Sequence, residues 1–290
     1  NITGAGSMNI YANDFGTYTN WQFPTSTYHT DGVIAFGNRS VITPFIYNNY
    51  FHGDLGAGSP TGQIFCTYGG AGNGSGSSCT IFNNVIVGVG YGTTHDTLIY
   101  FHGAAAGNPL GPHHLYNNTL LNGQNNITMD GDTATRYTAR NNIFLGGLPN
   151  QGSFFFGQES VPQPFASAIA IDHNAYFNAR WNWGGGVFTT LSSWQAGSGK
   201  DDSSVYADPN FDSTLLLQSG SPAIGRGTNL TSLCTGILTT LCSDKPATVG
   251  VGGSTIGNPR PTSGAWDAGA YQYIAGGIPA PPTGLRVVVH

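Results

Sequence analysis

A short asparagine-containing turn that keeps returning along the chain limits the possible folds more than any other feature. In each copy an apolar strand leads into one or two Asn, and a large apolar residue follows. The clearest copies are Tyr47-Asn48-Asn49-Tyr50-Phe51, Phe82-Asn83-Asn84-Val85-Ile86, Tyr116-Asn117-Asn118-Thr119-Leu120 and Arg140-Asn141-Asn142-Ile143-Phe144. Two related copies are Ala12-Asn13-Asp14-Phe15 and, more weakly, Asp172-His173-Asn174-Ala175-Tyr176. A turn that recurs roughly every 24–36 residues indicates stacked repeats rather than a closed globule.

A second repeated element, a short strand closed by Gly, precedes the Asn turns. Its copies are Val33-Ile34-Ala35-Phe36-Gly37, Phe65-Cys66-Thr67-Tyr68-Gly69, Ile99-Tyr100-Phe101-His102-Gly103, Ile127-Thr128-Met129-Asp130-Gly131 and Ser153-Phe154-Phe155-Phe156-Gly157. Each repeat is therefore expected to hold strand, turn, strand, Asn turn and strand, with the length variation in the loops.

Alignment of the repeats on these landmarks predicts columns of inward side chains, because strand residues alternate between two faces. The first predicted column is Ala35, Thr67, Phe101, Met129 and Phe155, and the second is Val33, Phe65, Ile99 and Ile127. The third follows the Asn turn and contains Phe51, Ile86, Leu120, Phe144 and Tyr176. At the corner itself, Asn49, Asn84, Asn118 and Asn142 are expected to form a ladder, since an amide can donate to one neighbour and accept from the other. Asn also tolerates left-handed backbone at a sharp corner.

Composition and charge exclude several classes of protein. Only 8% of residues are charged and the net charge is −5 with no basic run, which argues against binding of nucleic acid. No apolar run is long enough to span a membrane. The four Cys form two close pairs, Cys66 with Cys79 and Cys234 with Cys242, which predicts two local disulfides and an extracellular setting. The alternative is four free buried thiols; no Cys-x-x-Cys spacing indicates zinc.

The repeat resembles the right-handed parallel β-helix proteins of the pectate-lyase-like superfamily over residues 1–180. Residues 181–275 resemble a C-terminal segment common in secreted bacterial members, through Ser193-Trp194, Asp201-Asp202, Ala207-Asp208-Pro209-Asn210-Phe211, Gly220-Ser221-Pro222-Ala223-Ile224 and Asp267-Ala268-Gly269-Ala270-Tyr271. The resemblance implies an all-β solenoid of about six coils. It does not fix an activity, because the superfamily contains lyases, hydrolases, epimerases and adhesins.

The segments outside the repeat have expected structural roles. Trp181, Trp183 and Trp194 are expected to seal the last coil, because a solenoid end needs a cap. Residues 276–290 read as a Pro-rich tail. No N-terminal cap is recognisable, so we expect either upstream residues or an edge that pairs with another chain.

The best candidate site is the outward column that ends at the closing Gly. On the landmark alignment this column reads Phe36, Tyr68, His102, Asp130 and Phe156, and its neighbour reads Ile34, Cys66, Tyr100, Thr128 and Phe154. Tyr68 and Tyr100 could stack on sugar faces, and His102 and Asp130 on adjacent coils could move protons. Arg136 could contact the same ligand. The alternative is that the row is a surface covered by loops, with ordinary packing.

Two further candidates depend on acidic residues. His29-Thr30-Asp31-Gly32 is similar to the Asn-Thr-Asp-Gly motif of polygalacturonases, which carries Asp31 over as a catalytic acid. His29 stands where that family has the first Asn, and no Asp-Asp pair follows one coil later. Hydrolysis needs a second carboxyl, which Asp54 or Asp96 could supply only on the same face as Asp31, and Asp-Gly is also a turn signal. Asp130-Gly131-Asp132 could hold calcium, although it equally forms a turn. We predict no other metal or cofactor.

Two functional hypotheses follow. The first is a secreted β-helix protein that binds, and in one version cleaves as a lyase or hydrolase, a polysaccharide over Tyr68, Tyr100, His102 and Asp130. The second is a non-catalytic extracellular structural or adhesive protein that stacks end to end with copies of itself. The low charge and the missing full catalytic set support the second.

Overall fold

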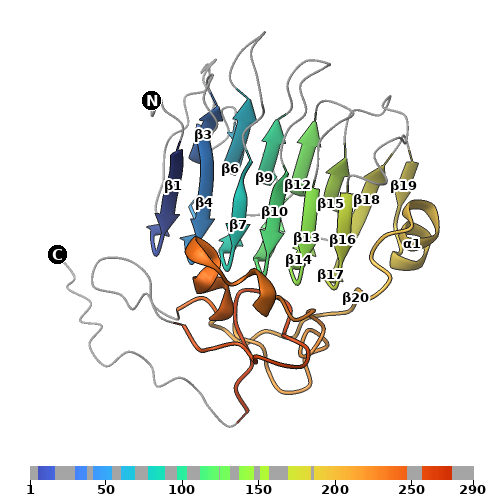
Figure 1. Ribbon diagram of the computed structural model, residues 1–290. Coiled ribbons are helices and arrows are strands. Elements are labelled where there is room, and N and C mark those ends of the chain that lie inside the picture. Colours follow the sequence, from blue (N-terminus) through green and yellow to red (C-terminus); the bar gives the residue numbers. More distant parts are fainter. Residues whose placement is uncertain are drawn as a thin grey trace, which may run out of the picture.

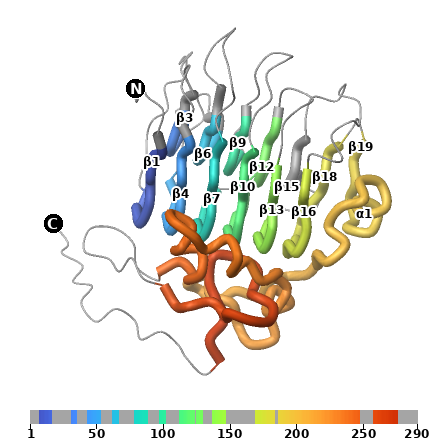
Figure 2. Tube along the Cα trace, viewed as in Figure 1, coloured from blue at the N-terminus to red at the C-terminus, as the bar shows by residue number. Residues whose placement is uncertain are grey.

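The structure is a computed structural model, and it shows a parallel β-solenoid with little helix (Figure 1). The residues it describes are 6–16, 30–37, 42–53, 60–68, 78–88, 97–102, 112–123, 125–130, 137–146, 151–156, 169–183, 186–246 and 257–275. Strands of successive coils lie side by side from the N-terminal to the C-terminal end of the solenoid (Figure 1, Figure 2).

Each coil contributes one strand to each of three sheets, which confirms the predicted strand, turn, strand, Asn turn, strand pattern. Sheet A has the order β1 (Gly6–Tyr11), β4 (Ile42–Tyr47), β7 (Thr80–Phe82), β10 (His113–Tyr116), β13 (Tyr137–Arg140) and β16 (Ile169–Asp172). Sheet B follows the Asn turn, with the order β2 (Asp14–Phe15), β5 (Tyr50–Phe51), β8 (Val85–Val87), β11 (Thr119–Gly123), β14 (Ile143–Gly146), β17 (Ala175–Phe177) and β20 (Val205–Tyr206).

Sheet C completes the coil. Its order is β3 (Thr30–Gly37), β6 (Pro60–Tyr68), β9 (Thr97–His102), β12 (Asn125–Asp130), β15 (Gln151–Phe156), β18 (Ala179–Trp183) and β19 (Gly186–Phe188). All of these neighbours are parallel except the last pair, in which β19 runs antiparallel to β18.

At the corner between sheets A and B, two consecutive residues have different roles. The first takes left-handed backbone, with φ between 52° and 61° at Asn48, Asn83, Asn117 and Asn141. The side chains of Asn83, Asn117 and Asn141 lie on the outer side of the corner, where they donate to carbonyls of the chain after β20. The second is the ladder residue. Asn49, Asn84, Asn118 and Asn142 are completely buried, which confirms the predicted ladder. The sequence predicted that one Asn would both adopt left-handed backbone and form the ladder. In the structure these two roles belong to two consecutive Asn residues.

The ladder is continuous and uniform. The backbone N–H and the side-chain Nδ2 of Asn84 both donate to Oδ1 of Asn118, each at 3.0 Å, and Asn118 donates in the same way to Asn142. The same Nδ2 of Asn118 reaches back to the carbonyl of Ile81 at 2.9 Å. The corner thus satisfies its buried backbone groups without water.

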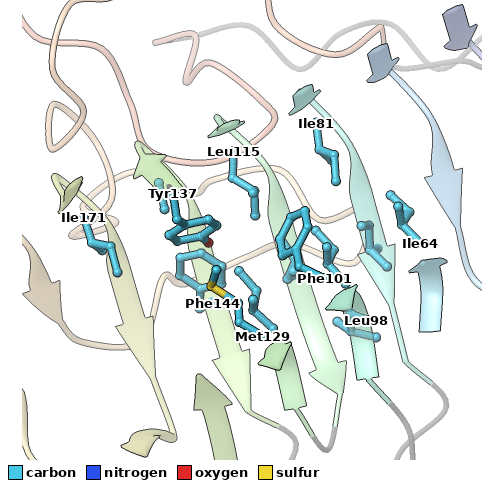
Figure 3. Close-up of a cluster of buried hydrophobic side chains, with 14 of the residues drawn as sticks. Ile64, Ile81, Leu98, Phe101, Leu115, Met129, Tyr137, Phe144 and Ile171 are labelled. Atoms are coloured by element: carbon cyan, nitrogen blue, oxygen red, sulfur yellow. The ribbon is translucent and has the colours of Figure 1, made fainter. Parts of the chain in front are cut away.

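The core lies between the three sheets, where inward side chains from every sheet converge (Figure 3). The third predicted column is confirmed: Phe51, Ile86, Leu120, Phe144 and Tyr176 are partners in register. The other two columns were wrong at β6 and β15 by one residue. The observed inward columns are Ala35, Cys66, Phe101 and Met129, and Val33, Ile64, Ile99 and Ile127. On β15 the register partner of Met129 is Phe156 and not Phe155.

The slip arises because the closing Gly does not hold one fixed register from coil to coil. Cys66 must face inward, since it forms a disulfide with Cys79 in the core. Because strand residues alternate between faces, this fixes which other residues of β6 face inward. The predicted disulfides are both present, Cys66 with Cys79 and Cys234 with Cys242.

The C-terminal end of the solenoid is closed by aromatic side chains and one carboxylate. The rings of Trp181 and Trp194 stack at 5.8 Å, with Trp194 on helix α1 (Leu191–Ser198). Asp201 is buried and accepts hydrogen bonds from Nδ2 of Asn174 (3.2 Å), the hydroxyl of Tyr176 (2.9 Å), Nε1 of Trp194 (2.7 Å) and the hydroxyl of Ser204 (2.5 Å). Burial raises the pKa of Asp201, and these donors oppose that shift.

After β20 the chain turns back along the outside of the Asn corner (Figure 2, orange to red). The described residues 207–246 and 257–275 are here called the return segment. It includes the short 3₁₀ helices η2 (Thr231–Leu233) and η3 (Gly236–Cys242). The outward Asn side chains hold it: Asn83 donates to the carbonyl of Ser243 (2.8 Å), Asn117 to that of Asp267 (3.1 Å) and Asn141 to that of Thr228 (2.8 Å). Its apolar residues Leu230, Leu241 and Trp266 pack on Tyr47, Phe82 and Tyr116 of sheet A.

Candidate functional site

The outer face of sheet C carries a row of side chains that crosses the coils. Ile34, Phe65, Tyr100 and Thr128 are partners in register from β3 to β12. The rings of Phe65 and Tyr100 stack at 5.1 Å; Phe65 is buried and Tyr100 is half-buried. Ile34 begins the row and leaves 49% of its surface exposed. We call these residues the sheet C row.

His102 and Asp130 lie on neighbouring strands at the same level. Asp130 on β12 is the register partner of His102 on β9, as the sequence predicted, and Thr67 is the partner of His102 on the other side. The side chains of His102 and Asp130 lie outside the described part of the structure. The backbone register therefore brings the two residues together, while their contacts stay a prediction.

Tyr68 does not belong to the column that contains His102. It is the register partner of Gly37, one position beyond the Phe36, Thr67 and His102 level. The cause is the same one-residue displacement of β6 that changed the predicted core columns. Arg136 and Asp132 fall outside the described residues, so the substrate contact of the first and the calcium site of the second are untested. Among the described residues no group of three or more His, Cys, Asp or Glu could hold a metal ion.

Asp31 has a local structural role in the described contacts. It lies at a register shift in β3, and its Oδ1 accepts a hydrogen bond from the backbone N–H of Gly62 at 3.1 Å. The carboxylate thus ties β3 to β6 across an irregular point in the ladder. Asp54 and Asp96, the residues that could pair with it for hydrolysis, lie outside the described ranges.

A second group of polar side chains gathers where the return segment meets the first two coils. Nε2 of His52 lies 2.5 Å from Oδ1 of Asp14, and the ring of Tyr50 stacks on the imidazole at 4.3 Å. The return segment adds Lys245, whose Nζ donates to the hydroxyl of Tyr271 at 3.2 Å and lies 5.8 Å from the centre of the Tyr50 ring. We call Asp14, Tyr50, His52, Lys245 and Tyr271 the junction cluster.

The electrostatics of the junction cluster are unusual for a surface. Lys245 is only 2% exposed, and burial lowers its pKa to about 8, although the carboxylates of Asp14 and Asp244 act in the opposite direction. Burial, together with the charge of Asp244, raises the pKa of Tyr271. His52 and Asp14 retain exposed surface and form a carboxylate-oriented imidazole, an arrangement that can exchange protons.

Sequence reasoning missed the junction cluster. The repeat alignment could have placed Asp14 beside Tyr50, because they occupy the same position after successive Asn turns. Lys245 and Tyr271 gave no such signal, since they lie in a segment without periodicity whose docking position depends on tertiary contacts.

Comparisons with protein-family models, with curated proteins and with solved structures give no match for this chain. Within the described residues, no helix is both long and apolar enough to cross a membrane.

Proposed function

We propose that this is an extracellular carbohydrate-binding β-helix of the pectate-lyase-like type, and that its glycan lies across the sheet C row. The observation that carries the proposal is the in-register row containing the stacked rings of Phe65 and Tyr100. Parallel coils repeat about every 4.8 Å, so the row presents similar contacts at regular intervals to a repeating polymer. The half-buried Tyr100 ring offers an apolar face of the kind that packs on sugar C–H surfaces.

The proposal extends to cleavage through His102 and Asp130. A His whose neighbour is a carboxylate is a suitable proton acceptor or donor near neutral pH. The two residues occupy adjacent strands, each two residues further along its strand than the row residues Tyr100 and Thr128, so a glycan over Tyr100 would lie beside them. The two disulfides are compatible with the extracellular location that such a substrate requires.

The test is binding to an array of soluble polysaccharides, followed by assays for reducing ends and for unsaturated uronide products. Tyr100→Ala should weaken binding about tenfold, which corresponds to about 1.4 kcal/mol of lost stacking, and leave the melting temperature nearly unchanged. Tyr11→Ala is the matched control, because Tyr11 is an exposed Tyr on the outer face of sheet A. Absence of any bound glycan, or equal loss in both variants, contradicts the proposal. His102→Ala should abolish product formation if the row is catalytic, and retained turnover removes His102 from the mechanism.

The second candidate is a non-catalytic structural or adhesive protein. One observation favours it: the first coil ends the sheets with β1, β2 and β3, and within the described residues no strand pairs with their outer edges. Open strand edges favour association with other chains. Inert behaviour on all glycans, with association that increases with concentration, would support this candidate instead.

A further inference from the structure

The strands of sheet C depart from strict alternation between core and solvent where they begin. On β9 the consecutive residues Leu98 and Ile99 both belong to the buried core, and Figure 3 shows Leu98 among the core side chains. On β12 the consecutive residues Asn126 and Ile127 have no exposed surface either. The residues on either side of each buried pair therefore belong to the outer face, and they are Thr97 and Tyr100 on β9 and Asn125 and Thr128 on β12.

A hydrogen bond brings these four residues together. The hydroxyls of Thr97 and Thr128 lie 3.1 Å apart, although the register partner of Thr97 is Asn125 and that of Thr128 is Tyr100. Tyr100, Thr128 and Asn125 each retain exposed surface, and no described residue forms a hydrogen bond with the side chain of Asn125. An aromatic ring, two hydroxyls and an amide thus meet at one place, here called the Tyr100 subsite.

The groups of the Tyr100 subsite match the hydroxyls of a sugar. An Asn amide donates and accepts at the same time, as a pair of neighbouring sugar hydroxyls does. In the bonded pair of Thr97 and Thr128, the hydroxyl that accepts keeps its own hydrogen for another partner. The Tyr100 ring can pack against sugar C–H groups. All of these groups are uncharged at neutral pH, so the subsite is suited to hydroxyls rather than to carboxylates.

The charged residues of sheet C favour the same class of ligand. The described strands from β3 to β15 contain no Lys or Arg, and their acidic residues are Asp31 and Asp130. Within these strands His102, the register partner of Asp130, is the one side chain that could become positively charged. Proteins hold carboxylates with Arg and Lys, and like charges placed opposite each other oppose binding. A polyuronate on this face would therefore be repelled.

We infer that the glycan on the sheet C row is an uncharged polysaccharide, and that Asn125 is a specificity-determining residue that binds its hydroxyls. The inference rests on the glycan-binding proposal, because it concerns the same face. A polyuronate brings one carboxylate per sugar toward Asp31 and Asp130. A neutral polymer replaces each of these carboxylates with a group that carries no charge, and its ring hydroxyls can bind Asn125 and Thr128.

The test compares polymers that differ in charge alone. Three polyuronates, of the galacto, manno and gluco configurations, are each paired with the same polymer after its carboxylates have been reduced to primary alcohols. Isothermal titration calorimetry measures the binding of all six polymers, once with calcium and once with a chelator. We expect the reduced member of at least one pair to bind at least tenfold more tightly than its polyuronate. The difference should shrink as salt is added, since salt screens the repulsion.

Variants of the protein test the two parts of the inference separately. Asn125→Leu should weaken binding of the neutral polymer about tenfold, which corresponds to about 1.4 kcal/mol. Asn9→Leu is the matched control, because Asn9 is an exposed Asn on the outer face of sheet A, and it should bind normally. Asp31→Asn and Asp130→Asn together should tighten binding of the polyuronate, and the Asn at position 31 keeps an oxygen that can accept from the N–H of Gly62.

A polyuronate that binds more tightly than its reduced partner, with or without calcium, would overturn the inference and leave the glycan-binding proposal standing. If no polymer and no glycan of the array binds, the glycan-binding proposal itself fails. Equal binding of the neutral polymer by Asn125→Leu and by the unaltered protein removes Asn125 from recognition. If Asn125→Leu fails to fold, Asn125→Ser replaces it, and the paired polymers on the unaltered protein still decide the charge of the ligand.

Discussion

Replacement of Asn118 by Leu tests whether the ladder holds the coils together. Leu has nearly the size and branching of Asn, so the substitution removes polar contacts and leaves little cavity. Three buried groups lose a hydrogen bond: the backbone N–H and Nδ2 of Asn84, which both donate to Oδ1 of Asn118, and the carbonyl of Ile81, which accepts from Nδ2 of Asn118 at 2.9 Å. Nδ2 of Asn84 still donates to the carbonyl of Ile46, so two groups are stranded. A stranded buried polar group costs about 1–3 kcal/mol, so the loss should be about 2–6 kcal/mol.

The measurement is urea unfolding followed by the fluorescence of the buried tryptophans, with the free energy taken by linear extrapolation. Asn13→Leu is the matched control in the same ladder. The side chain of Asn13 donates to the carbonyl of Tyr11 and to Oδ1 of Asn49, and no described group depends on its oxygen. Its loss should cost less than about 1 kcal/mol. If the two variants are equally stable, or if Asn118→Leu loses less than about 1 kcal/mol, the ladder does not stabilise the fold as argued.

Two further stability predictions follow from the return segment and the disulfides. Since burial lowers the pKa of Lys245 to about 8, below the ~10.4 of an unfolded lysine, the folded protein loses this proton first on raising the pH. Lys245 should therefore contribute a rise of about 2 kcal/mol in the free energy of unfolding between about pH 8 and pH 10. Burial raises the pKa of Tyr137, Tyr176 and Tyr271, and these groups act in the opposite direction, so the contribution is measured as the difference between the unaltered protein and Lys245→Met. Lys245→Met should remove that rise, and an unchanged pH profile in this variant would refute the assignment. Cys66 and Cys79 are separated by 13 residues. Replacement of both by Ala should lower the free energy of unfolding by about 3 kcal/mol. The equivalent change at Cys234 and Cys242, separated by 8 residues, should cost about 2.5 kcal/mol, and urea unfolding of the two double variants checks the order.

The corner of the fold was predictable from sequence because its physical demands select residues directly. A left-handed position followed by a buried amide leaves few choices, and pairs such as Asn83-Asn84 satisfy both. The register of sheet C was less predictable, because Gly marks the end of a strand without fixing its length. At Phe65 and Cys66 a one-residue displacement exchanges the inward and outward faces, which is the usual result of a register slip.

The two candidate sites likewise differ in how far the repeat pattern predicts them. The pairing of His102 with Asp130 follows from repeat alignment alone, and the structure places these residues opposite each other. The contact between Lys245 and Tyr271 beside Tyr50 joins segments about 200 residues apart, and no periodic pattern specifies such a contact. Its prediction would have required knowledge of how the return segment packs.

The return segment also changes how the protein is expected to fold. In an ordinary solenoid each repeat contacts only its neighbours, so a coil can form as soon as it has been synthesised. Here the outward amides of Asn83, Asn117 and Asn141 wait for partners that lie 160, 150 and 87 residues further along the chain. Closing loops of that length raises the contact order and slows the final step. The coils are thus expected to assemble early in a loosened form, with Phe82 and Tyr116 uncovered, and to become one cooperative unit only when the last part of the chain folds back over them.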